Sequence, residues 1–166
     1  MDVVVALKGQ YHASLAMLKD AVDQCPEDLW DRSDSAVPFW RVAYHALFFA
    51  HLYLMADEKA FRAWEHHREE SQFLGALPWP PHDQPKVVEP YTKADVLEYW
   101  AVCDAMVDTA VDALDLDASE CGFWWYKLPK LDHQINNIRH VQHHAAILSA
   151  RLRAAVGADV EWRGFD

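Results

Sequence analysis

Two histidines one helical turn apart are the first residues of this sequence whose spacing could do chemistry. Residues 133–148 read HQINNIRHVQHHAAIL, which places His140 and His144 at positions i and i+4. On a helix both imidazoles project from one face, and such a pair is a common way to hold one metal ion. A chain with 10 histidines also produces this spacing by chance, so the pair needs a further ligand to indicate a site.

His45 is the candidate for that further ligand. It lies between Val42 and Phe49 in an apolar stripe, where an imidazole without a partner would lose its hydration. Its partner is either a metal ion shared with His140 and His144, or an acceptor such as a backbone carbonyl or a tyrosine hydroxyl. Three neutral nitrogen donors leave coordination positions open, which is typical of catalytic zinc, and nickel or iron(II) also fits.

The remaining histidines are expected to play lesser roles. At roughly 100° per residue, His51 lies about 120° around its helix from His45, and His143 faces solvent, so neither is predicted to be a ligand. His12 is predicted to lie on a polar flank. A di-iron carboxylate site is excluded, because no histidine follows a glutamate by three residues.

The sequence allows two interpretations for several residues near the predicted ligands. His133 and Asn137 share the helix face of His140, so they either line its pocket or form an exposed polar flank. Three tryptophans either wall a substrate pocket or belong to the core: Trp40, Trp124 and Trp125. No carboxylate stands at a spacing that marks it as a general base.

Four amphipathic segments must position these residues. Apolar residues at three- and four-residue steps predict helices at about residues 2–24, 37–60, 93–115 and 129–156. The first helix is expected to end before Pro26, and the second to be capped by Ser33, Asp34 or Ser35 ahead of Pro38. A Thr92–Asp95 capping box should begin the third helix, and Gly157 should end the fourth.

The predicted fold is an all-α, single four-helix bundle that occupies residues 1–166 as one domain. No segment alternates with the period of a strand. The proline-rich segment 66–90 cannot be helical and forms a long connection. Such a connection can cross the bundle end to end, which predicts an up-down-down-up order.

Composition limits the partners. The net charge of −11 would repel phosphate backbones and anionic membrane surfaces, so neither nucleic acid nor a membrane is expected as a partner. The uncharged run 42–56 is shorter than the roughly 20 residues that span a bilayer. The first residues, MDVVVALKGQ, resemble no export signal, so we expect a cytoplasmic protein. The three cysteines form no C-x-x-C pair and predict reduced, buried thiols: Cys25, Cys103 and Cys121.

Nearly the whole chain resembles the DinB-like superfamily, which includes YfiT-like metal-dependent hydrolases and thiol-dependent S-transferases. The most specific matches are PFWRVAYHALFFAHLYL at 38–54 and NNIRHVQHHAAILSARLR at 136–153. The metal triad of that family falls on His45, His140 and His144. The resemblance also implies the up-down-down-up bundle, frequent homodimers, and a water or low-molecular-weight thiol activated on the metal. None of that family's thiol-binding or substrate-binding residues can be placed on this sequence.

Two functions follow as hypotheses. In the first, the ion lowers the pKa of bound water or of a thiol cofactor, so that the protein hydrolyses a small-molecule substrate or transfers a thiol to an electrophile. In the second, the bundle is a non-catalytic metal-binding or stress-response module. The open coordination positions of a three-histidine site favour the enzyme.

Overall fold

The chain folds into helices joined by irregular segments. The structure is a computed structural model that describes residues 2–32, 37–87 and 89–164, and no strand occurs within those ranges. The helices are α1 (Val3–Gln24), α2 (Glu27–Trp30), α3 (Phe39–Leu54), α4 (Lys93–Ala113) and α5 (Lys130–Val156). The predicted all-α class is therefore confirmed. No helix in the described ranges is both long enough and apolar enough to cross a membrane.

Most helix ends are set by the residues that the sequence marks for this role. The Asp2 carboxylate accepts hydrogen bonds from two backbone N–H groups of the first turn of α1, which ends ahead of Pro26. Thr92 and Asp95 form the predicted capping box of α4. Gly157 adopts the left-handed conformation, with φ of 71°, and ends α5.

The predicted helix at 37–60 is too long at its C-terminal end. α3 stops at Leu54, where the chain becomes extended at Met55. Asp57 then accepts a hydrogen bond from the backbone N–H of Ala60, at 2.9 Å, and so favours a turn over a continued helix. At its start, α3 follows Pro38 without a side-chain cap; the predicted caps Ser33, Asp34 and Ser35 lie outside the described residues. The short α2 was not predicted.

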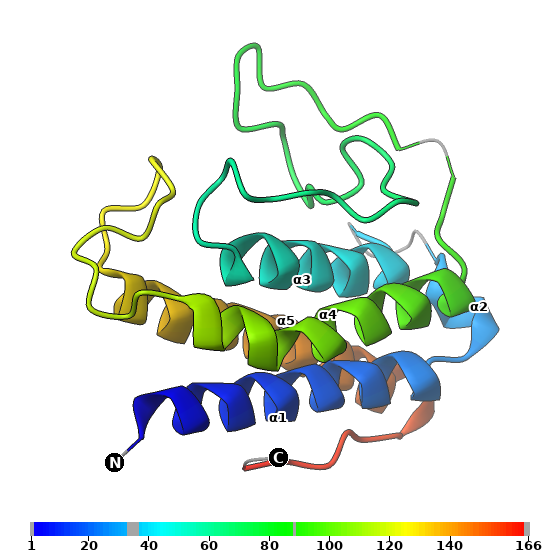
Figure 1. Ribbon diagram of the computed structural model, residues 1–166. Coiled ribbons are helices and arrows are strands. Elements are labelled where there is room, and N and C mark those ends of the chain that lie inside the picture. Colours follow the sequence, from blue (N-terminus) through cyan, green and yellow to red (C-terminus); the bar gives the residue numbers. More distant parts are fainter. Residues whose placement is uncertain (1, 33–36, 88, 165–166) are drawn as a thin grey trace.

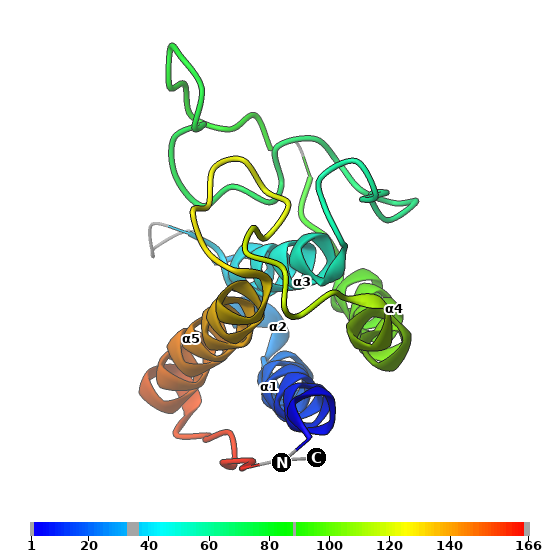
Figure 2. The same cartoon turned by 60° about the vertical axis from the view of Figure 1, so that its left-hand side comes forward.

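The four long helices pack against one another in a ring. α1 contacts α4 and α5, and α3 contacts the same two helices from the other side, as the view along the helices in Figure 2 shows. Large side chains from all four meet in the interior, among them Tyr11, Leu47, Tyr99 and Leu148. Both α3 and α5, which carry the predicted ligands, therefore face each other directly.

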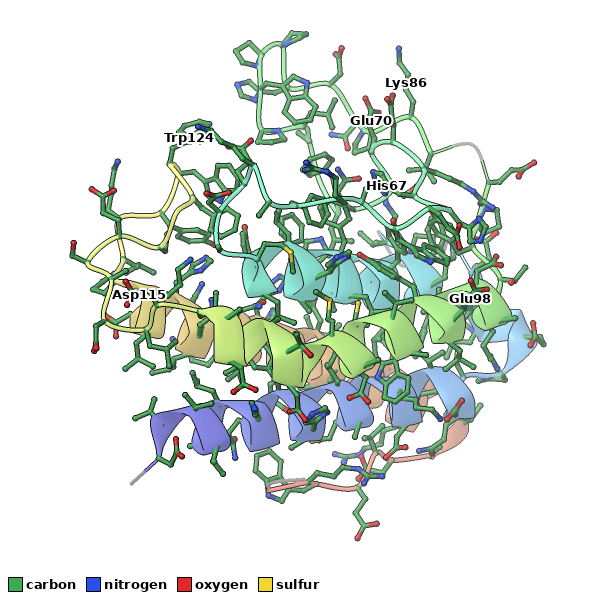
Figure 3. All side chains as sticks on the ribbon, viewed as in Figure 1. His67, Glu70, Lys86, Glu98, Asp115 and Trp124 are labelled. Carbon is green, nitrogen blue, oxygen red and sulfur yellow. The ribbon has the colours of Figure 1, made fainter. Side chains whose placement is uncertain are left out.

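The connection between α3 and α4 covers the outer side of α3 (Figure 1). It buries Trp64, Leu77 and Tyr91, and the Tyr44 hydroxyl on α3 lies 2.6 Å from Nδ1 of His67 on the connection (Figure 3). α3 is consequently buried almost all the way round and has no fully solvated face. The described part of the connection contains no helix, as its prolines predict.

Candidate metal centre

The three predicted ligands meet between α3 and α5. Nε2 of His140 lies 3.0 Å from Nε2 of His45 and 3.1 Å from Nε2 of His144. Ligand atoms of all three lie within 4.8 Å of one another, so the triad could hold a metal ion. Neighbouring nitrogens of a tetrahedral zinc site are about 3.3 Å apart, given Zn–N bonds near 2.0–2.1 Å. The observed separations are close to that value.

A backbone carbonyl fixes the tautomer of His45. Nδ1 of His45 lies 2.5 Å from the carbonyl oxygen of Gln72, on the connection that covers α3. A carbonyl oxygen only accepts hydrogen bonds, so Nδ1 carries the proton of the neutral ring. Nε2 therefore presents a lone pair to His140. Metal-ligating histidines usually make this kind of outer hydrogen bond.

The proton count favours a cation among the three nitrogens. His140 touches both neighbours through the same Nε2 atom, and a single N–H there cannot donate well in two directions. Without a cation, at least one of the two contacts would have no well-aligned hydrogen bond, and its nitrogens would meet at about van der Waals distance. One ion placed between the rings would satisfy all three nitrogens, so the residues fit a metal ion.

Burial keeps the triad neutral, which ligation requires. Loss of hydration lowers the pKa of His45 to about 4, that of His140 to about 4 and that of His144 to about 3. Neighbouring positive charges also lower these pKa values: the charge of Arg41 lowers that of His45, and the charge of His143 lowers that of His140. At neutral pH all three rings are in the form that binds a metal.

Phe49 forms an apolar wall of the triad. Its ring centroid lies 4.8 Å from that of His45 and 5.7 Å from that of His140. Phe49 also contacts Tyr53, whose ring lies 4.7 Å from His133. A continuous row of rings thus leads from the triad to the N-terminal end of α5.

The other histidines lie where they cannot join the triad, as predicted. His51 is buried on another side of α3, and its Nδ1 lies 3.0 Å from the Tyr99 hydroxyl. His143 is exposed. His12 lies on the flank of α1, with Nδ1 2.7 Å from a carboxylate oxygen of Asp104.

His133 and Asn137 are buried core residues, so an exposed polar flank is the wrong interpretation. Asn137 donates to the Tyr11 hydroxyl at 2.9 Å, whereas His133 packs among three aromatic rings and has no partner for either ring nitrogen among the described residues. Ile135, one of the apolar residues whose spacing predicts the helix at 129–156, is 45% exposed and does not face the core. Gln134 takes the interior position and bonds the Tyr11 hydroxyl at 2.7 Å.

The tryptophans and cysteines divide between core and surface. Trp40 is in the core and donates to Asp31 at 2.8 Å. Trp124 is 74% exposed at the outer end of the loop between α4 and α5 (Figure 3), and Trp125 is partly exposed beside it, so the core interpretation is wrong for both. The three cysteines are free and buried, as predicted.

Two groups near the triad were not predicted from the sequence. Gln72 contributes a main-chain atom from an irregular segment, which no residue pattern reveals. Arg41 lies one helical turn before His45, and this i, i+4 spacing could have drawn attention to it. A second cluster, formed by Glu65, His66 and Glu98, is fully on the surface, where charged groups of this kind are common without an ion.

Comparison with known proteins adds no further constraint. No family model matches the chain, and no significant match was found among curated proteins or solved structures. The geometry of the three histidines therefore carries the functional argument alone.

Proposed function

We propose that this protein is a metalloenzyme that binds one divalent ion on His45, His140 and His144. The observation that carries the proposal is the meeting of three Nε2 atoms at 3.0 and 3.1 Å in a partly buried site. Zinc or nickel suits three imidazole ligands best, and iron(II) is compatible.

The chemistry proposed is hydrolysis of a small molecule or transfer of a low-molecular-weight thiol to an electrophile. A bound ion lowers the pKa of water or of a thiol, and three protein ligands leave a position for either nucleophile. The residues of this chain then have distinct tasks. Gln72 orients His45 through its carbonyl oxygen, and Phe49 excludes water from one side of the rings.

We also propose that the ring of long helices is the up-down-down-up bundle of the DinB-like superfamily. The two sequence segments that carry the resemblance coincide with α3 and α5, where the triad lies. The long connection between α3 and α4 suits this order. Since a shared fold hosts many reactions, the site and not the fold must decide the activity.

A homodimer is part of the same proposal. Apolar side chains remain exposed on α1 and α4, among them Val5 and Val102, and a second copy could cover them. Such a dimer would bury helix faces. Sedimentation at high micromolar concentration should give twice the chain mass of 19.1 kDa, and a strict monomer would remove the dimer from the proposal.

Two measurements test the main proposal. Elemental analysis of protein purified without a His-tag should find one divalent ion per chain. Turnover of electrophiles should then be assayed with bacillithiol, mycothiol, glutathione and no thiol. Thiol-dependent turnover supports the transferase, and thiol-independent hydrolysis supports the hydrolase. A metal-loaded protein that turns over neither substrate class would instead be a binding module.

A further inference from the structure

Arg41 presents a partly buried guanidinium that lacks a counter-ion. Its Nε and Nη2 atoms are buried, and neither has a hydrogen-bond partner in the part of the chain that the structure describes. Among the described residues, no carboxylate forms an ion pair with it. An arginine side chain stays charged at all relevant pH values, so it cannot avoid the cost of burial by losing its proton. An unpaired charge of this kind indicates that a partner is missing.

The position of Arg41 places this charge beside the triad. Arg41 precedes His45 by four residues on α3, so the two side chains lie on one helix face about one turn apart. The Arg41 charge is close enough to lower the pKa of His45. A molecule bound at the triad would therefore meet the guanidinium.

A second arginine strengthens the positive field at this end of α3. Arg151 follows His144 by two helical turns on α5, and its Nη1 donates to the carbonyl oxygen of Val37 at 2.7 Å. Val37 lies one turn before Arg41, so both guanidinium groups approach the start of α3. Arg151 likewise has no carboxylate partner among the described residues. Two partly buried arginines without a carboxylate partner in the described chain, which lie on facing helices near the start of α3, favour an added anion.

We propose that Arg41 is a specificity-determining residue that binds an oxyanion, either a carboxylate or a phosphate, on the molecule that reaches the triad. The guanidinium fork can donate two parallel hydrogen bonds to either group. This inference rests on the proposed function, since it takes the triad as the site where the same molecule reacts. The substrate or thiol cofactor would then be an anionic small molecule.

Calorimetric titration of the zinc-loaded protein with inorganic phosphate, and separately with acetate, tests this inference. Arg41→Gln should weaken binding at least about tenfold, because a hydrogen bond to a charged group is lost. The anion affinity of Arg41→Lys should lie between those of the wild type and Arg41→Gln, since lysine keeps the charge but cannot donate two parallel hydrogen bonds. Arg139→Gln is the matched control: it removes the same charge from the exposed position next to His140 and should bind like the wild type. Equal affinity in Arg41→Gln and wild type, or an equal loss in Arg139→Gln, overturns the inference.

The two anions distinguish the source of the oxyanion. Arg41-dependent binding of phosphate alone indicates a phosphorylated molecule, and Arg41-dependent binding of acetate alone indicates a carboxylate. A thermal readout guards against misfolded variants: phosphate should raise the unfolding temperature of the wild type but not of Arg41→Met. An equal rise in both proteins contradicts the inference.

Zinc content separates this inference from the proposed function. If the protein binds one zinc per chain but its anion affinity does not depend on Arg41, the proposed function stands and the inference about Arg41 is wrong. A protein that binds no zinc loses the proposed function and the inference that rests on it.

Discussion

Nδ1 of His45 lies 2.5 Å from the carbonyl oxygen of Gln72, so a residue of an irregular segment sets the orientation of an imidazole on α3. The contact joins two residues that are 27 positions apart. It leaves Nε2 of His45 as the atom that faces His140. Because the acceptor is a main-chain atom, its contribution does not depend on the side chain at position 72.

Replacement of Gln72 should therefore leave the metal site intact. Gln72→Ala keeps the carbonyl oxygen, and we expect about one zinc per chain by elemental analysis, as in the wild type. A marked loss of zinc in this variant would show that the side chain, and not the carbonyl, supports His45.

Removal of any triad histidine should abolish tight metal binding. His45→Ala, His140→Ala and His144→Ala should each lower zinc affinity more than about 100-fold, since loss of an outer hydrogen bond alone costs 10–100-fold. Competition with a coloured chelator measures this change. His45→Ala should also lower the unfolding temperature of the metal-free protein, because it opens a small cavity against Phe49.

The control for these variants is His143→Ala, which lies next to His144 but is exposed. It should bind zinc like the wild type. His51→Ala should also keep its zinc, although it loses the contact with Tyr99 and some stability. Zinc loss in His143→Ala together with full zinc in the triad variants would show that the ligands are wrongly assigned.

The pKa of His133 predicts a pH-dependent stability. Burial, aided by the charge of Lys130, lowers this pKa to about 4 from an ordinary value near 6.5. The folded state therefore binds fewer protons than the unfolded state between these values. Stability is fully present above about pH 6.5 and falls as the pH drops toward 4, by up to about 3 kcal/mol.

Urea unfolding of the metal-free protein at pH 7 and pH 5 measures this effect. His133→Phe should lose less stability than the wild type over that interval, because phenylalanine has no proton to bind and suits a site lined by Tyr53, Phe123 and Tyr126. The same pH dependence in both proteins would assign the effect to other groups.

Two glycines with positive φ should respond differently to alanine. A Cβ at Gly122, where φ is +89°, would lie 2.4 Å from the carbonyl oxygen of Ala56, whereas no described residue lies within 4 Å of a Cβ at Gly157. Gly157→Ala should cost about 1–2 kcal/mol from the left-handed conformation alone. Gly122→Ala should cost clearly more, as chemical denaturation would measure. Similar losses in both variants would mean that the loop adjusts without strain.

Sequence patterns predicted the bounds of most helices well, but they did not predict which segments pack around those helices. α1, α4 and α5 begin and end within two residues of the predicted bounds, because their caps and prolines act locally. α3 ends early, and its outer side is buried by the segment that follows it. That burial depends on packing between distant residues, which periodicity does not report.

The same distinction applies to the site. The i, i+4 spacing of His140 and His144, and the place of His45 in an apolar stripe, were enough to bring the three together as predicted. Gln72 could not be identified from the sequence, because it acts through its backbone carbonyl. The spacing of Arg41 from His45 was visible in the sequence, but its lack of a partner in the described chain depends on packing. The buried polar face of α5 at Gln134 and Asn137 depends on Tyr11 in α1, which lies more than 120 residues away.

α3 is tied to the rest of the chain in three directions. His45 faces α5, the His51 ring bonds Tyr99 on α4, and the Tyr44 hydroxyl bonds His67 on the connection. Rotation of α3 about its own axis would break all three contacts together. The fold thus holds the His45 imidazole at one angle. If His45 binds the proposed ion, the entropy that a flexible side chain would lose on coordination has already been lost during folding.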